Sequence, residues 1–231
     1  MILAAGRGER MRPLTDTCPK PLMSVGGKPL IVWQIERLAR AGIVELVINH
    51  AHLGAQIEAA LGDGRRHGVR ISYSPEAEAL ETAGGVVKAL HLLGPEPFLV
   101  VSADIYCECD YQQLAERAAD LSDGTLAHLW LVDNRPWHPR GDFALRAGLL
   151  HAVGEPRLTY SNLGVYRPDF FAGVAPGTRL PLRPLLDRAI AAGKITGDRL
   201  DAVWDNIGTP AQLAELDAAL KRRLTQQTIH E

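Results

Sequence analysis

Apolar positions along the chain alternate between short unbroken runs and longer stretches in which they recur at helical spacing. The run from Phe98 to Val101 is apolar throughout, which is typical of a strand buried on both faces of a sheet. Pro29 begins an amphipathic stretch that stops at Gly42, and this pattern predicts a helix over 29–41. By the same criteria we expect further strands at 2–5, 46–48, 69–73, 125–132, 143–146 and 158–166, and further helices at 54–61, 82–93, 111–119, 182–192 and 210–224.

The succession of strands and helices predicts an α/β fold whose mostly parallel sheet is flanked by helices. The alternation is regular over 1–120 and gives way to shorter strands over 121–231. No low-complexity linker separates the two halves, so we expect a single domain over 1–231. No hexapeptide repeat is present, and a β-helix domain is therefore not expected.

Composition narrows the class of ligand. A chain of 231 residues with 46% hydrophobic content is long enough to bury a sizeable core. The net charge is -2 and the charges are interspersed, so we expect neither nucleic acid nor a membrane surface as partner. Cys18, Cys107 and Cys109 form no disulfide-like framework, and no signal-peptide pattern is present, which together favour the cytoplasm. A small-molecule ligand is the expectation that remains.

The loop after the first predicted strand carries the strongest chemical signal. It reads GRGERMRPLT over 6–15 and is followed by PKPL over 19–22. A glycine-bearing loop with fixed cations is suited to holding a triphosphate through backbone amides. It is not a dinucleotide-binding loop, because Met11 stands where the third glycine would be, nor a P-loop, because Glu9 follows Gly8.

The combination GxGxRMxPLT with PKPL resembles the signature of the sugar-nucleotide nucleotidyltransferases, which join a nucleoside triphosphate to a sugar 1-phosphate. The resemblance covers nearly the whole chain. It implies a Rossmann-like, GT-A-like fold with a nucleotide-binding half over 1–120 and a sugar-phosphate-binding half over 121–231. The segments ETAGG and YSNLGVY are most similar to members that act in cell-wall recycling. They imply UTP and N-acetylmuramic acid 1-phosphate as substrates and Mg²⁺ as cofactor.

Two aspartates are candidates for the metal ligands. Asp104 follows the buried strand at 98–101, at the carboxyl edge of the sheet, where ligands bind in open α/β folds. Asp205 lies in WDNIGTP over 204–210, which resembles the W-x-D-I-G-T-P segment of the family's second metal aspartate. Mg²⁺ needs only a few carboxylates beside phosphate oxygens, so the resemblance implies that both aspartates hold it. Each residue by itself could equally cap a turn or a helix.

The family's phosphate contacts map onto the loop and onto the lysine that follows it. The resemblance implies that Arg10 holds the β- and γ-phosphates and that Lys20 reaches the α-phosphate and the incoming phosphate. The second pKa of a phosphate monoester is about 6, so the attacking oxygen is ionised at neutral pH and no general base is needed. The expected catalytic residues are therefore Arg10, Lys20, Asp104 and Asp205, and the expected nucleotide contacts are Leu3, Ala4, Ala5, Gly6, Gly8, Glu76 and Ala83.

The residues expected to contact the base and the sugar are assigned from a weaker similarity to the family than the phosphate contacts are. Glu76 stands where the family has a base-contacting Gln or Glu, although it could also be a surface carboxylate. Glu81 occupies a position where the family often has glycine, and its role is left open. Arg140, Arg157 and Arg179 are candidates for a cation that meets the lactyl carboxylate of a muramic acid. The expected sugar contacts are Thr82, Gly141, Glu155 and Asn162, the last of which could instead be a strand-edge amide.

Two alternatives remain open at this level. A mannose-1-phosphate guanylyltransferase, or another sugar-1-phosphate nucleotidyltransferase, has nearly the same signature. A non-catalytic sugar-nucleotide sensor subunit could share the fold, but the presence of Lys20, Asp104 and Asp205 favours an enzyme. A monomer is expected.

Overall fold

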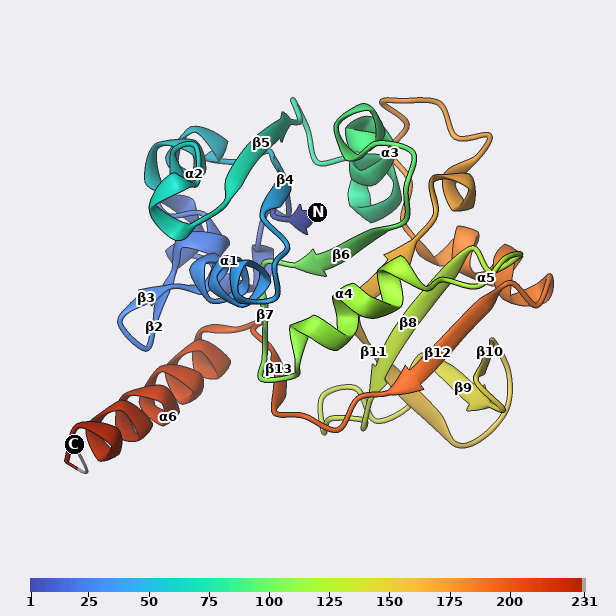
Figure 1. The fold of residues 1–231 in the computed structure, drawn as a ribbon. Coiled ribbons are helices and arrows are strands. Elements are labelled where there is room, and N and C mark those ends of the chain that lie inside the picture. Colours follow the sequence, from blue (N-terminus) through green and yellow to red (C-terminus); the bar gives the residue numbers. More distant parts are fainter. Residues whose placement is uncertain (230–231) are drawn as a thin grey trace.

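A nine-stranded mixed sheet runs through the computed structural model, which describes residues 1–229 (Figure 1). Its strands follow the order β5-β4-β1-β6-β11-β8-β12-β10-β9. The strands are β1 (Ile2–Leu3), β4 (Glu45–His50), β5 (Arg70–Pro75), β6 (Phe98–Ser102), β8 (Ala127–Val132), β9 (Phe143–Arg146), β10 (Leu149–His151), β11 (Arg157–Tyr166) and β12 (Ile195–Arg199). This α/β architecture confirms the expected fold class.

Parallel pairing is concentrated in the first half of the sheet. β5, β4, β1 and β6 are parallel to one another, as the regular alternation predicted. β11 then pairs antiparallel with both β6 and β8, whereas β12 returns parallel to β8. The sheet is thus parallel from β5 to β6 and mixed from β11 to β9.

Helices cover both faces of the sheet, and the sheet separates two hydrophobic cores. The helices are α1 (Leu30–Arg40), α2 (Gly54–Leu61), α3 (Glu81–Leu93), α4 (Tyr111–Ala119), α5 (Arg183–Ala191) and α6 (Pro210–Ile229). Helices α1, α2 and α4 contribute to one core, and α3 and α5 to the other. On β6, Leu99 and Val101 belong to the first core and Phe98 and Val100 to the second, which explains why this strand is apolar throughout.

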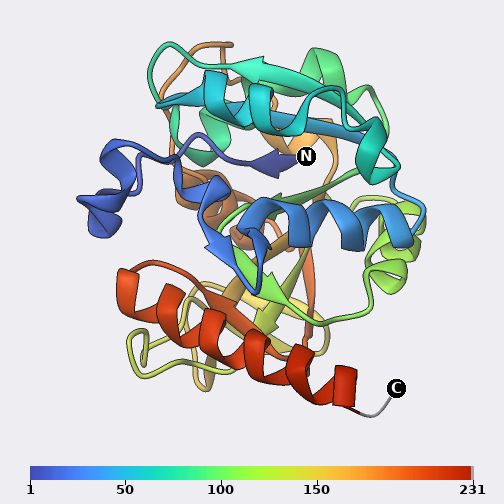
Figure 2. The same ribbon diagram turned by 90° about the vertical axis from the view of Figure 1, so that its left-hand side faces the viewer.

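Two short ribbons lie outside the main sheet. β2 (Ser24–Val25) pairs with β3 (Lys28–Pro29), and β7 (Ile105–Cys107) pairs antiparallel with β13 (Trp204–Asn206). The β7–β13 ribbon brings the end of β6 next to the segment that leads into α6. Figure 2 shows α6 running below α1, and a small third core joins the two helices.

The predicted helices 54–61 and 111–119 agree with α2 and α4, and the other predicted helices differ from the observed ones only at their ends. β7, β10 and β12 are additional strands that the hydrophobic pattern did not predict. They are short, and β12 contains Gly197 and Asp198, so they lack an apolar alternation long enough to be recognised. No helix within residues 1–229 combines the length and apolar character needed to cross a membrane.

The two-sided burial of β6 generates a stability prediction. Val101 is fully buried, so Val101→Ala should lower the free energy of unfolding by about 2 kcal/mol through lost burial and a residual cavity. Val203 is 46% exposed, and the matched Val203→Ala should stay within about 0.5 kcal/mol of the wild type. Urea denaturation followed by circular dichroism measures both values. Equal losses would contradict the placement of β6 between two cores.

Candidate active site

The carboxyl ends of three parallel strands open into a cavity of about 470 Å³. Leu3 at the end of β1 lies beside Asn49 of β4 and Ser102 of β6, and all three residues line it. Ligands bind at this edge of open α/β sheets. Seven of the predicted site residues line the cavity, namely Leu3, Ala4, Ala5, Gly6, Lys20, Thr82 and Asp104.

Lys20 and Asp104 form an ion pair in this cavity although 84 positions separate them in sequence. The Lys20 Nζ atom lies 2.5 Å from Asp104 Oδ2, and the lysine side chain is only 10% exposed. Lys20 begins a short 3₁₀ turn over Lys20–Leu22, and Asp104 lies just beyond the end of β6. A buried ammonium group needs such a partner, because desolvation without one is costly. The pair therefore fixes a cation and a carboxylate together at the strand ends.

The glycine loop is held by its own arginine. Arg7 donates hydrogen bonds to Thr15 O at 2.8 Å and to Asp16 Oδ1 at 3.0 Å. The hydrogen bond from Arg7 lowers the pKa of the Asp16 carboxyl. Gly8 has φ 68, and a Cβ there would lie 2.9 Å from Thr15 Cγ2, so a larger residue would be strained. Gly8 does not line the cavity, and its positive φ allows the loop to turn.

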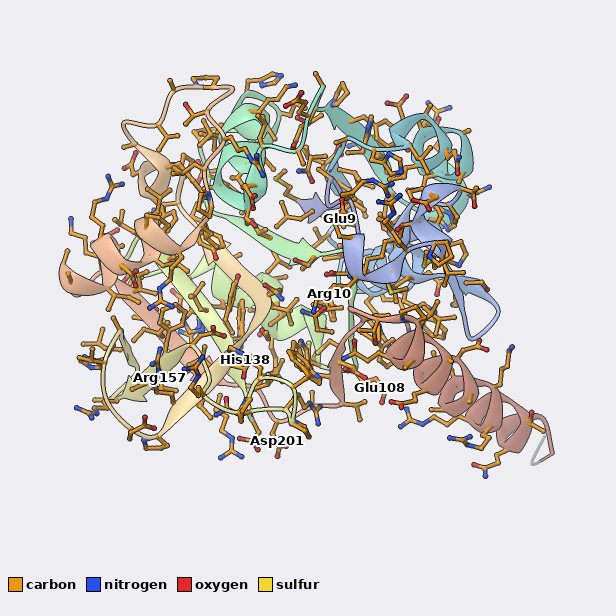
Figure 3. All side chains as sticks on the ribbon, turned by 180° about the vertical axis from the view of Figure 1, so that it is seen from behind. Glu9, Arg10, Glu108, His138, Arg157 and Asp201 are labelled. Carbon is orange, nitrogen blue, oxygen red and sulfur yellow. The ribbon has the colours of Figure 1, made fainter. Side chains whose placement is uncertain are left out.

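Arg10 occupies a different place from the other phosphate candidates. Its side chain is exposed, and its terminal nitrogen would lie 3.0 Å from a Cβ on Gly208. Figure 3 shows it between the loop of Glu9 and the start of α6. It makes no ion pair within residues 1–229. The structure thus places a guanidinium group next to the WDNIGTP segment, and its phosphate role remains a prediction.

Glu76 lies behind the cavity wall. It is 6% exposed, so the alternative of a surface carboxylate is wrong. Its Oε1 accepts a hydrogen bond from Asn49 Nδ2 at 2.7 Å, and its Oε2 accepts one from Leu80 N at 2.8 Å. Asn49 Oδ1 in turn accepts a hydrogen bond from Ala4 N at 3.0 Å. Glu76 thereby ties the start of α3 to the end of β1 within the wall, and a contact with the base remains a prediction.

Glu81 adopts the left-handed conformation that the family's glycine would provide. Its φ is 62, and its carboxylate lies 3.1 Å from Arg179 NH2. Both side chains line the first cavity. Ala83, two residues further on, is fully buried in the core and does not line the cavity. Sequence reasoning left Glu81 open, and the structure places it at the site in a conformation unusual for a residue with a side chain.

A second cavity of about 320 Å³ adjoins the first at Thr82, which lines both. Asn162 lines it from a β-bulge in β11, with φ 61, and its contact with a sugar remains a prediction. The same cavity is also lined by Trp137, His138, Asp142, Tyr160, Arg183, Trp204 and Asn206. His138 is labelled in Figure 3.

The other two predicted sugar contacts do not line this cavity. Gly141 has φ 61, and a Cβ on it would lie 2.7 Å from Asn134 Oδ1, so it shapes the turn before Asp142. Glu155 is exposed in the loop between β10 and β11. Direct sugar contacts from these two residues remain predictions.

Asp205 and Asn206 point to opposite sides of β13, because successive strand residues alternate. Asp205 lines a separate cavity of about 460 Å³ that also contains Arg135 and Glu215, and burial raises the pKa of its carboxyl. Asn206 lines the second cavity, and its Oδ1 is buried without a hydrogen-bond partner. Neither side chain lines the cavity that contains Asp104, and the metal role of Asp205 remains a prediction.

Sequence reasoning missed Asn206, although the signal was present. In the family pattern W-x-D-I-G-T-P, the aspartate stands two positions after the tryptophan. Counting from Trp204 leads to Asn206 and not to Asp205. The next residue, Ile207, donates its backbone N–H to Asp104 O at 2.9 Å, so this segment lies directly against the Lys20–Asp104 pair.

Comparison with known proteins agrees with this geometry. The family described as Nucleotidyl transferase matches residues 1–139. The chain is 50% identical to the N-acetylmuramate alpha-1-phosphate uridylyltransferase of Neisseria meningitidis, over 94% of this chain and 96% of the relative. It is 34% identical to the protein of the same name from Caulobacter vibrioides, over 95% and 96%. The solved structure of a UDP-glucose pyrophosphorylase with UDP-glucose has the same fold, with a TM-score of 0.76 at 19% identity over 96% of this chain and 97% of its own.

This chain belongs to the nucleotidyl transferase family and is an enzyme of the sugar-1-phosphate nucleotidyltransferase class. The expected family and enzymatic character are confirmed, and the sensor subunit is not retained. No β-helix is found within residues 1–229, as the missing hexapeptide repeat predicted.

The conformation of Glu81 generates a prediction that is independent of activity. Glu81→Gly should retain or raise stability, because glycine adopts positive φ without steric cost. Glu81→Val should lower the free energy of unfolding by about 2 kcal/mol, because a β-branched side chain clashes in this conformation. Chemical denaturation of the two variants measures the difference. Equal stability would show that the left-handed conformation at Glu81 is not maintained in solution.

Proposed function

We propose that this enzyme transfers UMP from UTP to N-acetylmuramic acid α-1-phosphate, giving UDP-N-acetylmuramic acid and pyrophosphate. The single observation that carries the proposal is the pair of adjoining cavities that share Thr82, one beside Lys20 and Asp104 and the other beside Asn162 and Asn206. The first provides backbone and charge suited to a triphosphate, and the second combines aromatic and hydrogen-bonding side chains, a lining suited to a sugar. The names of the Neisseria and Caulobacter relatives support the choice of base and sugar.

The chemistry that these residues have to provide is charge stabilisation. The phosphate oxygen of the acceptor is already ionised at neutral pH, so it attacks the α-phosphorus in line without a general base. The bond from that phosphorus to the bridging oxygen breaks, and pyrophosphate leaves with the electron pair. Lys20 is the cation that meets the reacting phosphates, and Asp104 holds its ammonium group in position. We assign to Arg10, whose guanidinium lies beside Gly208, the neutralisation of charge on the departing pyrophosphate.

The oxygen donors of the site fit Mg²⁺. Asp104 supplies a carboxylate, and the unpartnered Oδ1 of Asn206 supplies a neutral oxygen from the adjacent segment. Hard oxygen ligands of this kind, with phosphate oxygens completing the set, are what Mg²⁺ prefers. When bound there, Mg²⁺ would neutralise charge on the phosphates. We infer that Asn206, and not Asp205, is the second protein ligand. Within residues 1–229, no group of three or more His, Cys, Asp or Glu side chains is arranged to hold a metal ion.

The proposed partners are UTP and a sugar 1-phosphate. Operation as a monomer in the cytoplasm stays a prediction from the sequence.

A substrate grid tests the proposed reaction. Pyrophosphate release would be measured with Mg²⁺ for UTP, dTTP, GTP and CTP against the 1-phosphates of N-acetylmuramic acid, N-acetylglucosamine, glucose and mannose. The expected result is a dominant signal with UTP and N-acetylmuramic acid 1-phosphate. A dominant signal with GTP and mannose 1-phosphate would instead support the guanylyltransferase alternative and overturn the proposed substrates.

Three variants test the metal ligands. Asp104→Ala and Asn206→Ala should each lower kcat/KM by about 100-fold or more, because each removes one of the two proposed oxygen ligands of the metal. Asp205→Ala should lose less than about tenfold, because its side chain lies in another cavity. Binding of Mn²⁺ in the presence of UTP, followed by electron paramagnetic resonance, provides a readout independent of turnover. Near-normal binding by Asn206→Ala together with loss in Asp205→Ala would restore the assignment to Asp205.

A further inference from the structure

Arg183 is the only lysine or arginine within residues 1–229 that lines the second cavity. It is the first residue of α5 and contributes to the wall together with Leu182 and Leu186. The cavity's other basic side chain, His138, is already paired with Asp142 at 3.1 Å. The other carboxylate oxygen of Asp142, Oδ2, accepts a hydrogen bond from Tyr160 N at 2.8 Å. Arg183 is therefore the permanent positive charge on this side of the site.

The guanidinium group of Arg183 is held in a defined orientation. Its Nε donates a hydrogen bond to Asp187 Oδ1 at 2.7 Å, one turn further along α5. Its Cζ lies 5.0 Å from the ring centre of Phe143, which is buried. The two terminal nitrogens have no hydrogen-bond partner within residues 1–229. A braced guanidinium with a free outer edge is preorganised for a planar, two-oxygen anion.

The arginines considered from sequence are less suited to that role. Arg157 donates to the backbone oxygen of Asp142 and does not line the cavity. Arg179 lines the first cavity, where Glu81 is its partner. Arg140 is exposed in a turn and lines neither cavity. None of these three arginines lines the second cavity.

We propose that Arg183 binds the carboxylate of the acceptor's lactyl group and so selects an acidic sugar 1-phosphate over a neutral one. This inference rests on the proposed function, which places the acceptor in the second cavity. The acceptor carries two anions, its 1-phosphate and its lactyl carboxylate. The phosphate must reach the Lys20–Asp104 side. The carboxylate then meets the guanidinium on the α5 side. A neutral N-acetylhexosamine lacks this second anion, and it leaves the terminal nitrogens of Arg183 unpaired.

The test compares two acceptors on the same enzyme with UTP. The quantity measured is the ratio of kcat/KM for N-acetylmuramic acid 1-phosphate to kcat/KM for N-acetylglucosamine 1-phosphate. Arg183→Gln should lower this ratio by about ten- to 100-fold, mainly through KM, because a charge-assisted hydrogen-bonded pair is lost. Arg183→Lys should recover part of the ratio, since it keeps the charge but loses the planar fork. Isothermal titration with N-acetylmuramic acid 1-phosphate should show the same order of affinities.

Arg199→Gln is the matched control, because Arg199 is exposed on β12 and paired with Asp133 away from both cavities. It should leave the ratio unchanged, and circular dichroism should show that all variants fold. An unchanged ratio in Arg183→Gln, or an equal loss for both acceptors, would overturn the role of Arg183 alone. Failure of the wild-type enzyme to use N-acetylmuramic acid 1-phosphate would overturn the proposed function, and this inference with it.

Discussion

The contact between Lys20 and Asp104 is the constraint on which the rest of the site depends. The Lys20 side chain is 10% exposed, and an opposite charge within hydrogen-bond distance offsets the hydration that its ammonium group loses. The carboxylate of Asp104 reaches Lys20 because β6 ends at Ser102, two residues earlier. The lysine can meet that carboxylate only if the glycine loop turns back over the sheet. Loop, turn and central strand are therefore fixed relative to one another by a single pair of charges.

The site lies where the two halves of the sheet meet. The first cavity, to which we assign the nucleotide, is built at the ends of parallel strands. The second, to which we assign the sugar, draws on β11 and on the segment around Trp204. Two residues with side chains, Glu81 and Asn162, adopt positive φ at this junction. Such conformations cost energy and persist where the surrounding structure imposes them, which is common at functional sites. The β7–β13 ribbon completes the arrangement by holding Asn206 and Ile207 against Asp104.

Much of the fold could be predicted because the hydrophobic pattern is long and regular in the first half. The helices over Gly54–Leu61 and Tyr111–Ala119 and the apolar strand through Val101 each carry enough residues for their period to be recognised. The ribbon strand Ile105–Cys107 could not be recognised, because three residues define no period. Of the candidate site, those residues that follow directly from a strand end, such as Leu3 and Asp104, line the expected cavity. Gly141 and Glu155, which lie in loops, do not line the sugar cavity.

The sequence by itself determined the family and the identity of the charged groups, because GxGxRMxPLT with PKPL is a local pattern readable without any contact information. It also determined that a carboxylate follows the central strand. Only the tertiary structure decided which side chains meet. It turned Glu76 inward to Asn49, placed Asp205 and Asn206 on opposite sides of one strand, and set Arg183 against Phe143 at the sugar cavity. The physical reason is that side-chain direction depends on strand register and on long-range packing, and neither is written into the local order of residues.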